Sequence, residues 1–568
     1  METEQSKKCL DCGTPFTVSE SDASFYQKMK VNAPDFCPQC GVQRMMVFRN
    51  ERIVYKRTCE KCNRETMSLY HPDSPYVVYC HDCWWSDKWE GTEYGAEYDS
   101  SRPLINQFKE LQHKVPREAL IILNSTNSDY GNNVRESKDC YFCFLVANCE
   151  RLLYSVWMVG AKECMDVHKV TDSELVFNSV DVAKSYHSAY MQDSSDCSEC
   201  YFSYDLKGCN HCLFSYNLRN KSYFVRNKQV TKEEYEGEIV KALNGNYKNL
   251  SEAEEEYKQL KARALRKFAL ILKSSNVSGN YLQNCGKSFW CFDGVGNEEV
   301  RYVASILYAK NVLYSYSIGT QPTEFLFGNS VIKGGSNIKQ SFNLFNCSDC
   351  AWCDSSLSSS NCIACVGLKS KEYCILNKQY TKEEYKKIAA EIEVKGELAQ
   401  FLPISFGTFA YNETAAQDYY PLTKDEALAR GYSWQDDSLF TSGKETISPD
   451  ELPDNIKDTK DDITKEILKC VECERNYRVV QDEVSYLRRL NMPIPRKCPQ
   501  CRFKERREAR LPFKLWKRQC MCDYNIRKND VVHSHHKEGR CPNEFDTSYS
   551  PDRKEIVYCE QCYQSEVA

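Results

Sequence analysis

The hydrophobic and polar positions of residues 128–224 repeat every twelve residues. One column of the repeat holds small or apolar residues: Ser128, Cys140, Leu152, Cys164, Val176, Ser188, Cys200, Cys212 and Phe224. A second column holds only small residues: Ser137, Cys149, Ala161, Ser173, Ser185, Cys197 and Cys209. A third is mostly apolar: Val134, Val146, Met158, Val170, Val182, Ser194, Leu206 and Leu218. Turn-forming residues separate the second and third columns, among them Asn148, Gly160, Asp172, Asp196, Gly208 and Asn220. Self-similarity at a fixed period predicts a repeat fold.

Twelve residues are too few for a helical hairpin, and no 3.6-residue period runs through these rows. The pattern therefore predicts a narrow β-solenoid whose coils stack about 4.8 Å apart. A further column is largely aromatic: Tyr130, Phe142, Tyr154, Asp166, Asn178, Tyr190, Phe202 and Phe214. Such a column could form an exposed stacking platform for sugars, bases or peptide. We favour a place in the core, the commoner environment of aromatic side chains.

A second copy of this repeat begins near Ser275 and lies 150 positions after the first. The segment Thr-Lys-Glu-Glu-Tyr follows both copies, starting at Thr231 and at Thr381. Rows of twelve are regular from Leu326 onward and interrupted before Glu324. Capping boxes predict helices that begin after Thr231, Ser251, Thr381 and Thr423, and residues 104–114 form a further predicted helix.

Cysteine pairs with two-residue spacing occupy both ends of the chain. The amino end holds two complete sets: Cys9, Cys12, Cys37 and Cys40, then Cys59, Cys62, Cys80 and Cys83. The carboxyl end repeats the same intervals with Cys470, Cys473, Cys498 and Cys501, then Cys520, Cys541, Cys559 and Cys562. Four thiolates are the donor set that tetrahedral structural zinc prefers, so we predict about four structural Zn²⁺ ions.

An insertion splits the last set and contains Cys522, His533, His535 and His536. We favour a solvated loop over metal ligation for these four residues, because the alignment already fills four tetrahedral positions.

The 33 cysteines come without an apolar signal-peptide core at the amino terminus, and no apolar run is long enough for a bilayer. We therefore expect reduced thiols, a cytoplasmic location and no membrane contact.

The paired modules, including Val-Tyr-Cys at Val78–Cys80 and Val557–Cys559, resemble uncharacterised bacterial zinc-ribbon (treble-clef-like) proteins with paired zinc modules flanking a Cys-rich repeat. The resemblance implies zinc binding and no particular reaction.

The predicted fold is multidomain and mainly β: tandem narrow β-solenoids with helical spacers, flanked by paired treble-clef or zinc-ribbon modules. The predicted segments are 1–90 (two zinc-ribbon modules), 91–126 (connector), 127–230 (first solenoid), 231–273 (helical spacer), 274–380 (second solenoid), 381–435 (helix and connector), 436–468 (acidic, flexible linker) and 469–568 (two zinc-ribbon modules).

Cysteines inside the repeats also have the spacing of metal knuckles: Cys197, Cys200, Cys209 and Cys212, and Cys350, Cys353, Cys362 and Cys365. In neighbouring rows the same columns hold Ser, Ala, Leu or Val, and these residues could not replace a cysteine that binds metal. We favour a buried ladder over a metal site.

A basic segment, 496–518, leaves the third cysteine set and offers a candidate nucleic-acid contact at Arg502, Arg506, Arg507, Arg510 and Lys514. A solvated helix face is the competing interpretation.

No glycine-rich phosphate loop, Gly-x-Ser-x-Gly elbow or His-Glu-x-x-His helix is present in the sequence. We therefore predict a non-enzymatic, zinc-binding scaffold whose partner is protein or nucleic acid, with no small-molecule substrate. The alternative is a zinc- or thiolate-dependent enzyme that uses the central cysteine clusters or the split fourth site.

Overall fold

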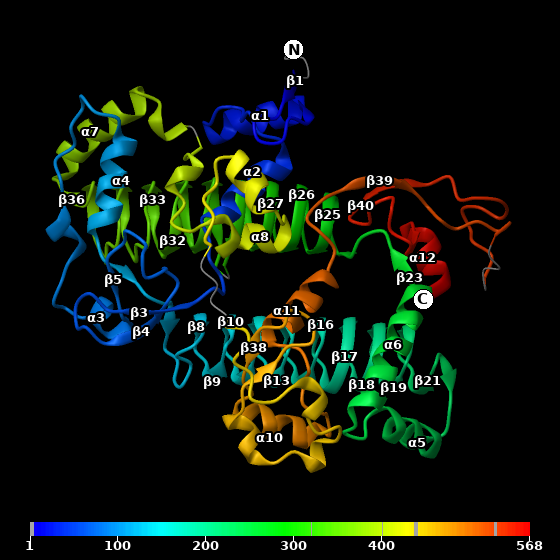
Figure 1. The fold of residues 1–568 in the computed structure, drawn as a ribbon. Helices are drawn as coiled ribbons and strands as arrows, with labels where there is room; N and C mark the ends of the chain where they lie inside the picture. The colour runs from blue at the N-terminus through cyan, green and yellow to red at the C-terminus, as the bar shows by residue number, and fades with distance from the viewer. Residues whose placement is uncertain (1–4, 320, 400, 437–440, 527–530, 568) are drawn as a thin grey trace.

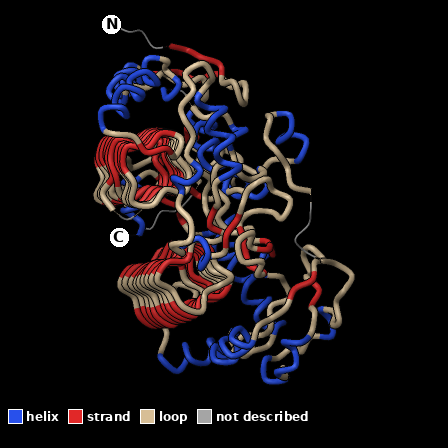
Figure 2. Tube along the Cα trace, turned by 90° about the vertical axis from the view of Figure 1, so that its left-hand side faces the viewer, coloured by secondary structure: helices blue, strands red, loops and turns tan. Residues whose placement is uncertain are grey.

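The computed structural model describes residues 5–319, 321–399, 401–436, 441–526 and 531–567. The chain is mainly β, with two large, mostly parallel sheets and four-cysteine groups at both ends. We call the two sheets rod 1 and rod 2, because each winds into a stack of coils that Figure 2 shows nearly end-on. Rod 1 comprises β7 Ile122–Leu123, β8 Asn132–Arg135, β9 Lys138–Tyr141, β10 Phe144–Ala147, β11 Glu150–Leu153, β12 Val156–Val159, β13 Lys162–Met165, β14 His168–Thr171, β15 Glu174–Phe177, β16 Val180–Ala183, β17 Tyr186–Ser195, β18 Ser198–Lys207, β19 Asn210–Leu213, β20 Tyr216–Arg219, β21 Ser222–Val225 and β22 Lys228–Gln229. Rod 2 comprises β24 Ile271–Leu272, β25 Ser275–Gln283, β26 Gly286–Val295, β27 Glu298–Leu307, β28 Ala309–Ile318, β29 Thr323–Phe327, β30 Ser330–Lys333, β31 Gly335–Lys339, β32 Phe342–Phe345, β33 Ser348–Ala351, β34 Ser360–Ile363, β35 Glu372–Ile375 and β36 Lys378–Gln379.

Each coil of rod 1 takes twelve residues. Parallel pairs join positions twelve apart, such as Phe144 with Val156 and Cys200 with Cys212. The inward side chains recur every third residue, so each coil has four inner positions. The residue before each inner position turns the chain: φ is 55° at Asp196 and 50° at Glu199. The three columns found in the sequence are three of the four inner columns. The fourth is Gly131, Cys143, Ser155, Val167, Ser179, Met191, Ser203 and Ser215.

Rod 2 contains the interruption that its sequence indicates. Most pairs again join residues twelve apart, but Ala309 pairs with Thr323, fourteen positions on. Two extra residues therefore enter the coil after Ile318, which explains the broken register before Glu324. At the start of the rod, Ile271 pairs with Leu282, so this first coil is one residue short.

Most of the aromatic column is buried, with Tyr130 exposed, and the buried rings lie outside the coils rather than within them. Tyr190 and Phe202 are turning residues with positive φ, so their rings point away from the rod interior. The two rings stack with centroids 4.4 Å apart. Helix α6 (Tyr247–Arg263) covers them, and its Tyr257 ring meets Phe202 edge-on. These aromatics thus form a second core layer between rod and helix.

The two rods lie side by side and run in opposite directions in Figure 1: rod 1 from β8 at the left to β21, and rod 2 from β25 at the right to β36. Helix α5 (Lys232–Ala242) packs on the last coils of rod 1, and α7 (Lys382–Val394) on the end of rod 2. The capping boxes at Thr231, Thr381 and Thr423 are all formed. The predicted start at Ser251 is wrong: α6 begins after Asn246, whose side chain accepts from the Asn249 amide. Helix α4 spans Leu104–Lys114 as predicted.

Four modules, which we call metal modules, pack against the rods, and each is built around one four-cysteine group that could hold a metal ion. Module 1 contains β1 Gln5–Lys8, β2 Pro15–Val18, α1 Glu20–Met29 and α2 Pro38–Val47; module 2 contains β3 Tyr55–Thr58, β4 Glu65–Ser68, β5 Val78–Tyr79 and α3 His81–Trp85. Module 3 contains β37 Leu468–Lys469, β38 Asn476–Tyr477, α10 Gln481–Leu490 and α11 Pro499–Glu508; module 4 contains β39 Trp516–Gln519, β40 Glu544–Thr547, β41 Ile556–Tyr558 and α12 Glu560–Val567. The remaining elements are η1 Gly91–Tyr94, β6 Arg117–Glu118, β23 Leu265–Lys267, η2 Glu397–Ala399, η3 Ile404–Phe406, η4 Tyr411–Glu413, α8 Ala415–Tyr419, α9 Lys424–Ala429, η5 Pro449–Glu451, η6 Ile456–Asp458 and η7 Asp461–Lys465.

The modules and rods follow a pseudo-twofold arrangement. Strand β5 of module 2 pairs in parallel with β6, which leads into rod 1, and β41 of module 4 pairs in the same way with β23, which leads into rod 2. An ion pair links the module to the entry strand at both places. The cation belongs to the module in the first pair and to the entry strand in the second. His81 lies 2.9 Å from Glu118 in the first, and Lys267 lies 2.8 Å from Glu560 in the second. Each rod is therefore anchored to a metal module at its first coil.

The entry strands also connect the rods to one another. Arg117 on β6 forms a buried ion pair of 2.7 Å with Asp354 of rod 2. Arg266 on β23 lies over the Tyr204 ring of rod 1, 3.5 Å from its centroid. Positions 204 and 354 are 150 apart, which is the offset between the two repeats. The duplication seen in the sequence thus reappears as reciprocal contacts between the rods.

Residues 441–468 do not form the flexible linker that their composition predicts. Leu452, Ile456 and Ile463 are buried against module 3. Arg496 donates to the backbone oxygens of Pro449 and Leu452 at 2.6 and 3.0 Å. This acidic segment can pack against module 3 because its apolar side chains lie on one side and its charged side chains on the other. The predicted linker residues 437–440 lie outside the described part of the chain.

Within the described residues, no helix combines the length and apolar character that crossing a membrane requires.

Candidate metal centres

Each of the four predicted cysteine sets is assembled in space. The four sulfurs of every set lie within 4.8 Å of one another. Four thiolates around a tetrahedral zinc ion at about 2.3 Å would be about 3.8 Å apart. The sulfurs of Cys12 and Cys37 are 3.8 Å apart, those of Cys62 and Cys80 are also 3.8 Å apart, and in the other two modules the corresponding distances are 3.7 and 3.9 Å. The four sets therefore fit tetrahedral metal ions, and the sulfurs are too far apart for disulfides.

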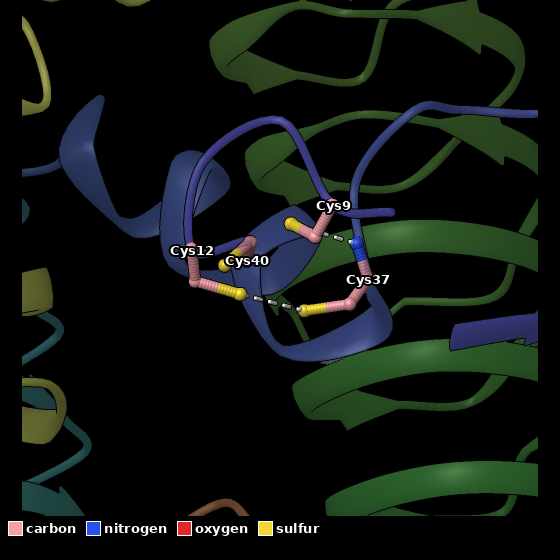
Figure 3. A group of neighbouring side chains, drawn as sticks. All are labelled: Cys9, Cys12, Cys37 and Cys40. Atoms are coloured by element: carbon pink, nitrogen blue, oxygen red, sulfur yellow. Dashed lines mark hydrogen bonds between the residues drawn. The ribbon is translucent and has the colours of Figure 1, made fainter. Parts of the chain in front are cut away.

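All four sets are built in the same way. A two-stranded hairpin presents the first cysteines, and a helix begins at or just after the third. The backbone N–H of that third cysteine donates to the sulfur of the first: Cys37 to Cys9 at 3.3 Å, and Cys80 to Cys59, Cys498 to Cys470 and Cys559 to Cys520 at 3.2 Å each. Figure 3 shows the first set, with the sulfurs of Cys12 and Cys37 facing each other.

The local electrostatics favour the thiolate form of one cysteine in each set, while burial raises the pKa of others such as Cys9 and Cys501. A hydrogen bond from the Arg64 guanidinium, 3.4 Å from the Cys62 sulfur, lowers the pKa of that thiol to about 6. Hydrogen bonds from neighbouring thiols likewise lower the pKa of Cys37 and of Cys470. Metal ions bind the deprotonated form, so these shifts bring Cys62, Cys37 and Cys470 closer to their binding state.

Module 1 docks on rod 2 through the helix that follows its third cysteine. Helix α2 is buried along most of its length. A Cβ atom added to Gly41 would lie 2.3 Å from two ring carbons of Tyr314, a fully buried residue of β28. The Tyr26 and Tyr314 hydroxyls are 3.4 Å apart, and Arg301 of rod 2 pairs with Asp22 at 2.6 Å. The glycine is required because the helix contacts the rod at backbone distance.

Module 3 docks on rod 1 by a different chemistry at the equivalent place. Helix α11 carries Arg502 where α2 carries Gly41. Arg502 pairs with Asp166 of rod 1 and lies 3.0 Å from Glu483 of α10, while Arg506 pairs with the same Asp166 at 2.9 Å. All of these charged groups are buried, so each depends on its partner.

Arg510 joins both rods to module 3. Its guanidinium lies 2.7 Å from a carboxylate oxygen of Asp181 in rod 1 and 2.6 Å from one of Asp293 in rod 2. Lys169 also pairs with Asp293. The two cations keep the pKa of Asp293 below its usual range despite burial. Burial outweighs Arg510 at Asp181 and raises its pKa to about 6.

These contacts correct the expected role of the basic segment. Arg502, Arg506 and Arg510 are buried and paired with carboxylates, so their guanidinium groups are not presented to a phosphate backbone. Arg507 is half-buried and Lys514 is exposed. The sequence shows the basic residues but not the rod carboxylates, which lie more than two hundred positions away in the chain.

The cysteines inside the rods occupy inner columns and are buried. Their sulfurs point at backbone carbonyls: Cys197 lies 3.2 Å from the Ser195 oxygen, and Cys350 lies 3.2 Å from the Ser348 oxygen. Serines at inner positions make the same bond, as Ser137 does with Arg135 at 2.6 Å. This geometry favours the buried ladder over metal ligation.

The described part of the module 4 insertion is largely exposed, but its four candidate ligands turn inward. Cys522 and His533 are fully buried. His533 and His536 lie with Cys522 and Cys562 in a second four-donor group, which shares Cys562 with the fourth cysteine set. The spacing Cys522-x10-His533-x2-His536 is visible in the sequence and is compatible with metal ligands. From the sequence alone we assigned no metal to it, because the alignment already supplied four cysteines for the fourth set.

No protein-family model matches the chain, and the search of curated proteins finds no similar sequence at a significant level.

Proposed function

We propose that this protein is a non-enzymatic scaffold: two tandem β-solenoids clasped by four treble-clef-like zinc modules. The carrying observation is that each predicted cysteine set offers four protein thiolates at tetrahedral spacing. Such sets leave no coordination position for a substrate, so zinc there contributes folding free energy rather than chemistry.

The way the modules dock supports a structural role for the metal. Two of the helices that dock the modules on the rods begin at a cysteine ligand: α2 at Cys37 and α11 at Cys498. The ordering of Gly41 against Tyr314, and of Arg502, Arg506 and Arg510 against the rod carboxylates, therefore depends on the metal sites that start these helices. Segments of about 40 residues cannot bury a sufficient core alone.

The uncovered flank of the rods is the surface we assign to a partner. In Figure 2 much of the chain outside the two stacks lies to their right, and no described segment is seen over the left-hand flank of the lower stack, which is rod 1. On rod 1, equivalent outward positions of successive coils alternate in charge: Lys138, Glu150, Lys162 and Glu174. Alternating charges give no net attraction for a polyanion, so we propose a protein partner rather than nucleic acid.

Affinity capture with the intact chain and a charge-altered chain tests this proposal. The substitutions Lys138→Glu and Lys162→Glu change the exposed flank and leave the inner columns intact. Lys232→Glu, on the exposed start of α5, is the matched control. We expect a protein retained by wild type and control to be lost by the double variant. Salt-sensitive binding of RNA or DNA that the double variant retains would contradict the proposed partner class.

A further inference from the structure

The insertion of module 4 folds back onto the fourth cysteine set and brings three additional donors to it. The Cys522 sulfur lies 3.5 Å from Nδ1 of His533 and 3.3 Å from Nε2 of His536. The Cys562 sulfur lies 3.4 Å from Nε2 of His536. These four donor atoms lie within 4.8 Å of one another, as the thiolates of each cysteine set do.

The distances are those of a coordination sphere. With zinc–sulfur bonds of about 2.3 Å and zinc–nitrogen bonds of about 2.05 Å, a tetrahedral ion holds sulfur and nitrogen about 3.6 Å apart. The three sulfur–nitrogen distances above, 3.3, 3.4 and 3.5 Å, agree with this value.

The Glu566 carboxylate orients the His533 imidazole by bonding to the ring nitrogen that faces away from Cys522. Nε2 of His533 lies 2.7 Å from a carboxylate oxygen of Glu566 on α12, so the remaining nitrogen, Nδ1, faces Cys522. The His533 side chain is fully buried and that of Glu566 is 6 % exposed. Histidines that bind metal usually donate their second N–H to a carboxylate in this way, which fixes the ring and its tautomer.

We propose that module 4 holds two zinc ions bridged by the Cys562 thiolate. The first ion is bound by Cys520, Cys541, Cys559 and Cys562, and the second by Cys522, His533, His536 and Cys562. Two divalent ions with five thiolates and two neutral imidazoles carry a net charge of −1, whereas a single four-thiolate zinc site carries −2. Sharing one thiolate thus reduces the negative charge that the buried site must hold.

His535 has a different place in this centre. Its Nε2 lies 3.2 Å from the Cys562 sulfur and 3.5 Å from the Cys541 sulfur. Cys520 already fills the fourth position of the first ion, since it receives the Cys559 N–H at 3.2 Å as the first cysteine does in the other modules. We therefore assign to His535 a hydrogen bond to the thiolates and not a coordination bond.

The second ion would fix the insertion to α12, the helix that carries both Cys562 and Glu566. This helix itself contacts rod 1 and the entry to rod 2: its Tyr563 bonds to Asp205 of rod 1, and its Glu560 pairs with Lys267 on β23. The bridged centre therefore stabilises the joint between the end of rod 1 and the start of rod 2.

Zinc content per full-length chain gives the first test. We expect five ions in the wild type and four in Cys522→Ser and in His533→Ala, because only the second ion loses a ligand that is not shared. Cys164→Ser, which changes a rod cysteine bonded to a carbonyl, and His535→Ala should both retain five. Four ions in the wild type would overturn the proposal.

The second test needs no variant and so does not depend on the folding of a substituted chain. After exchange with ¹¹³Cd, a shared thiolate should produce scalar coupling between one pair of cadmium resonances, while the other three remain uncoupled. X-ray absorption on the zinc protein should show a zinc–zinc distance of about 3.8 Å, set by two 2.3 Å bonds meeting at a tetrahedral sulfur. Five ions without coupling and without this distance would overturn the bridge. In that case the second ion has three protein ligands and an open position, the arrangement of a catalytic site.

Discussion

Replacing Arg510 with Met should destabilise the protein strongly, because it leaves buried carboxylates without their cation. Asp181 and Asp293 are 11 % and 6 % exposed, and the Arg510 side chain is 2 % exposed. Breaking a buried ion pair by removing one partner costs about 3–5 kcal/mol. Lys169 remains paired with Asp293, so the uncompensated charge is mainly that of Asp181, and we expect a loss of about 3 kcal/mol at neutral pH.

The loss should depend on pH with a defined sign. The pKa of Asp181 is about 6 in the folded chain, and that of an unfolded aspartate is about 3.9. The folded state therefore binds the proton more tightly, and ionised Asp181 lowers stability as the pH rises through this interval. Without Arg510 the folded pKa rises further. The difference between variant and wild type should then be largest at pH 8 and smaller at pH 6.

Urea unfolding followed by tryptophan fluorescence, with zinc present, measures this difference. Arg507→Met, which lies three residues before Arg510 in the last turn of α11 and is half-buried, is the matched control and should change stability by less than about 0.5 kcal/mol. Adding Asp181→Asn to Arg510→Met removes the unpaired charge and should recover most of the loss. A loss below about 1 kcal/mol, or no recovery in the double variant, would refute the proposed role of this ion pair.

Three further substitutions probe the docking surface, the rod interior and a rod cap. Gly41→Ala should lower stability despite the gain of about 1 kcal/mol in helix propensity, because the overpacking against Tyr314 costs about 1–3 kcal/mol; in a Tyr314→Ala background the same change should become stabilising, and thermal unfolding of the four chains decides between these outcomes. Cys200→Ser should change stability by less than about 1.5 kcal/mol and leave the zinc content unchanged, since serine makes the same bond to the carbonyl at equivalent inner positions; loss of a metal ion would show instead that the rod cysteines are ligands. Thr231→Ala should cost about 1 kcal/mol by removing the capping box of α5, measured by hydrogen exchange at the end of rod 1, and undiminished protection there would contradict this role.

The twelve-residue period of the rods could be predicted from the sequence, but the three-residue period within each coil could not. Inner positions carry Cys, Ser, Val and Met in no fixed order, so no single residue type marks the shorter period. The turning positions are also not restricted to the residues that usually form turns. Leu145 and Trp157 have φ of 61° and 62°, a region that bulky residues rarely adopt. Stacking of identical backbone turns, coil upon coil, overrides the preference of the single residue.

The cysteine sets were predictable because their ligands lie close in sequence at fixed intervals. The docking of the modules was not. Nothing local to Arg510 indicates that Asp181 and Asp293, on two different rods, converge on it. The insertion of module 4 is an intermediate case: its spacing of Cys522, His533 and His536 is visible in the sequence, but its convergence on Cys562 appears only in the fold.

Hydrogen exchange of the full-length chain with and without a high-affinity zinc chelator tests the central claim most directly. If zinc sites start the helices that clasp the rods, chelation should remove protection first from α2 and α11 and then from their contacts on β28 and β14, while the inner strands of both rods exchange later. Returning zinc should restore protection in the same segments. Helices α2 and α11 that stay protected in the metal-free chain would contradict the proposal that metal holds this scaffold together.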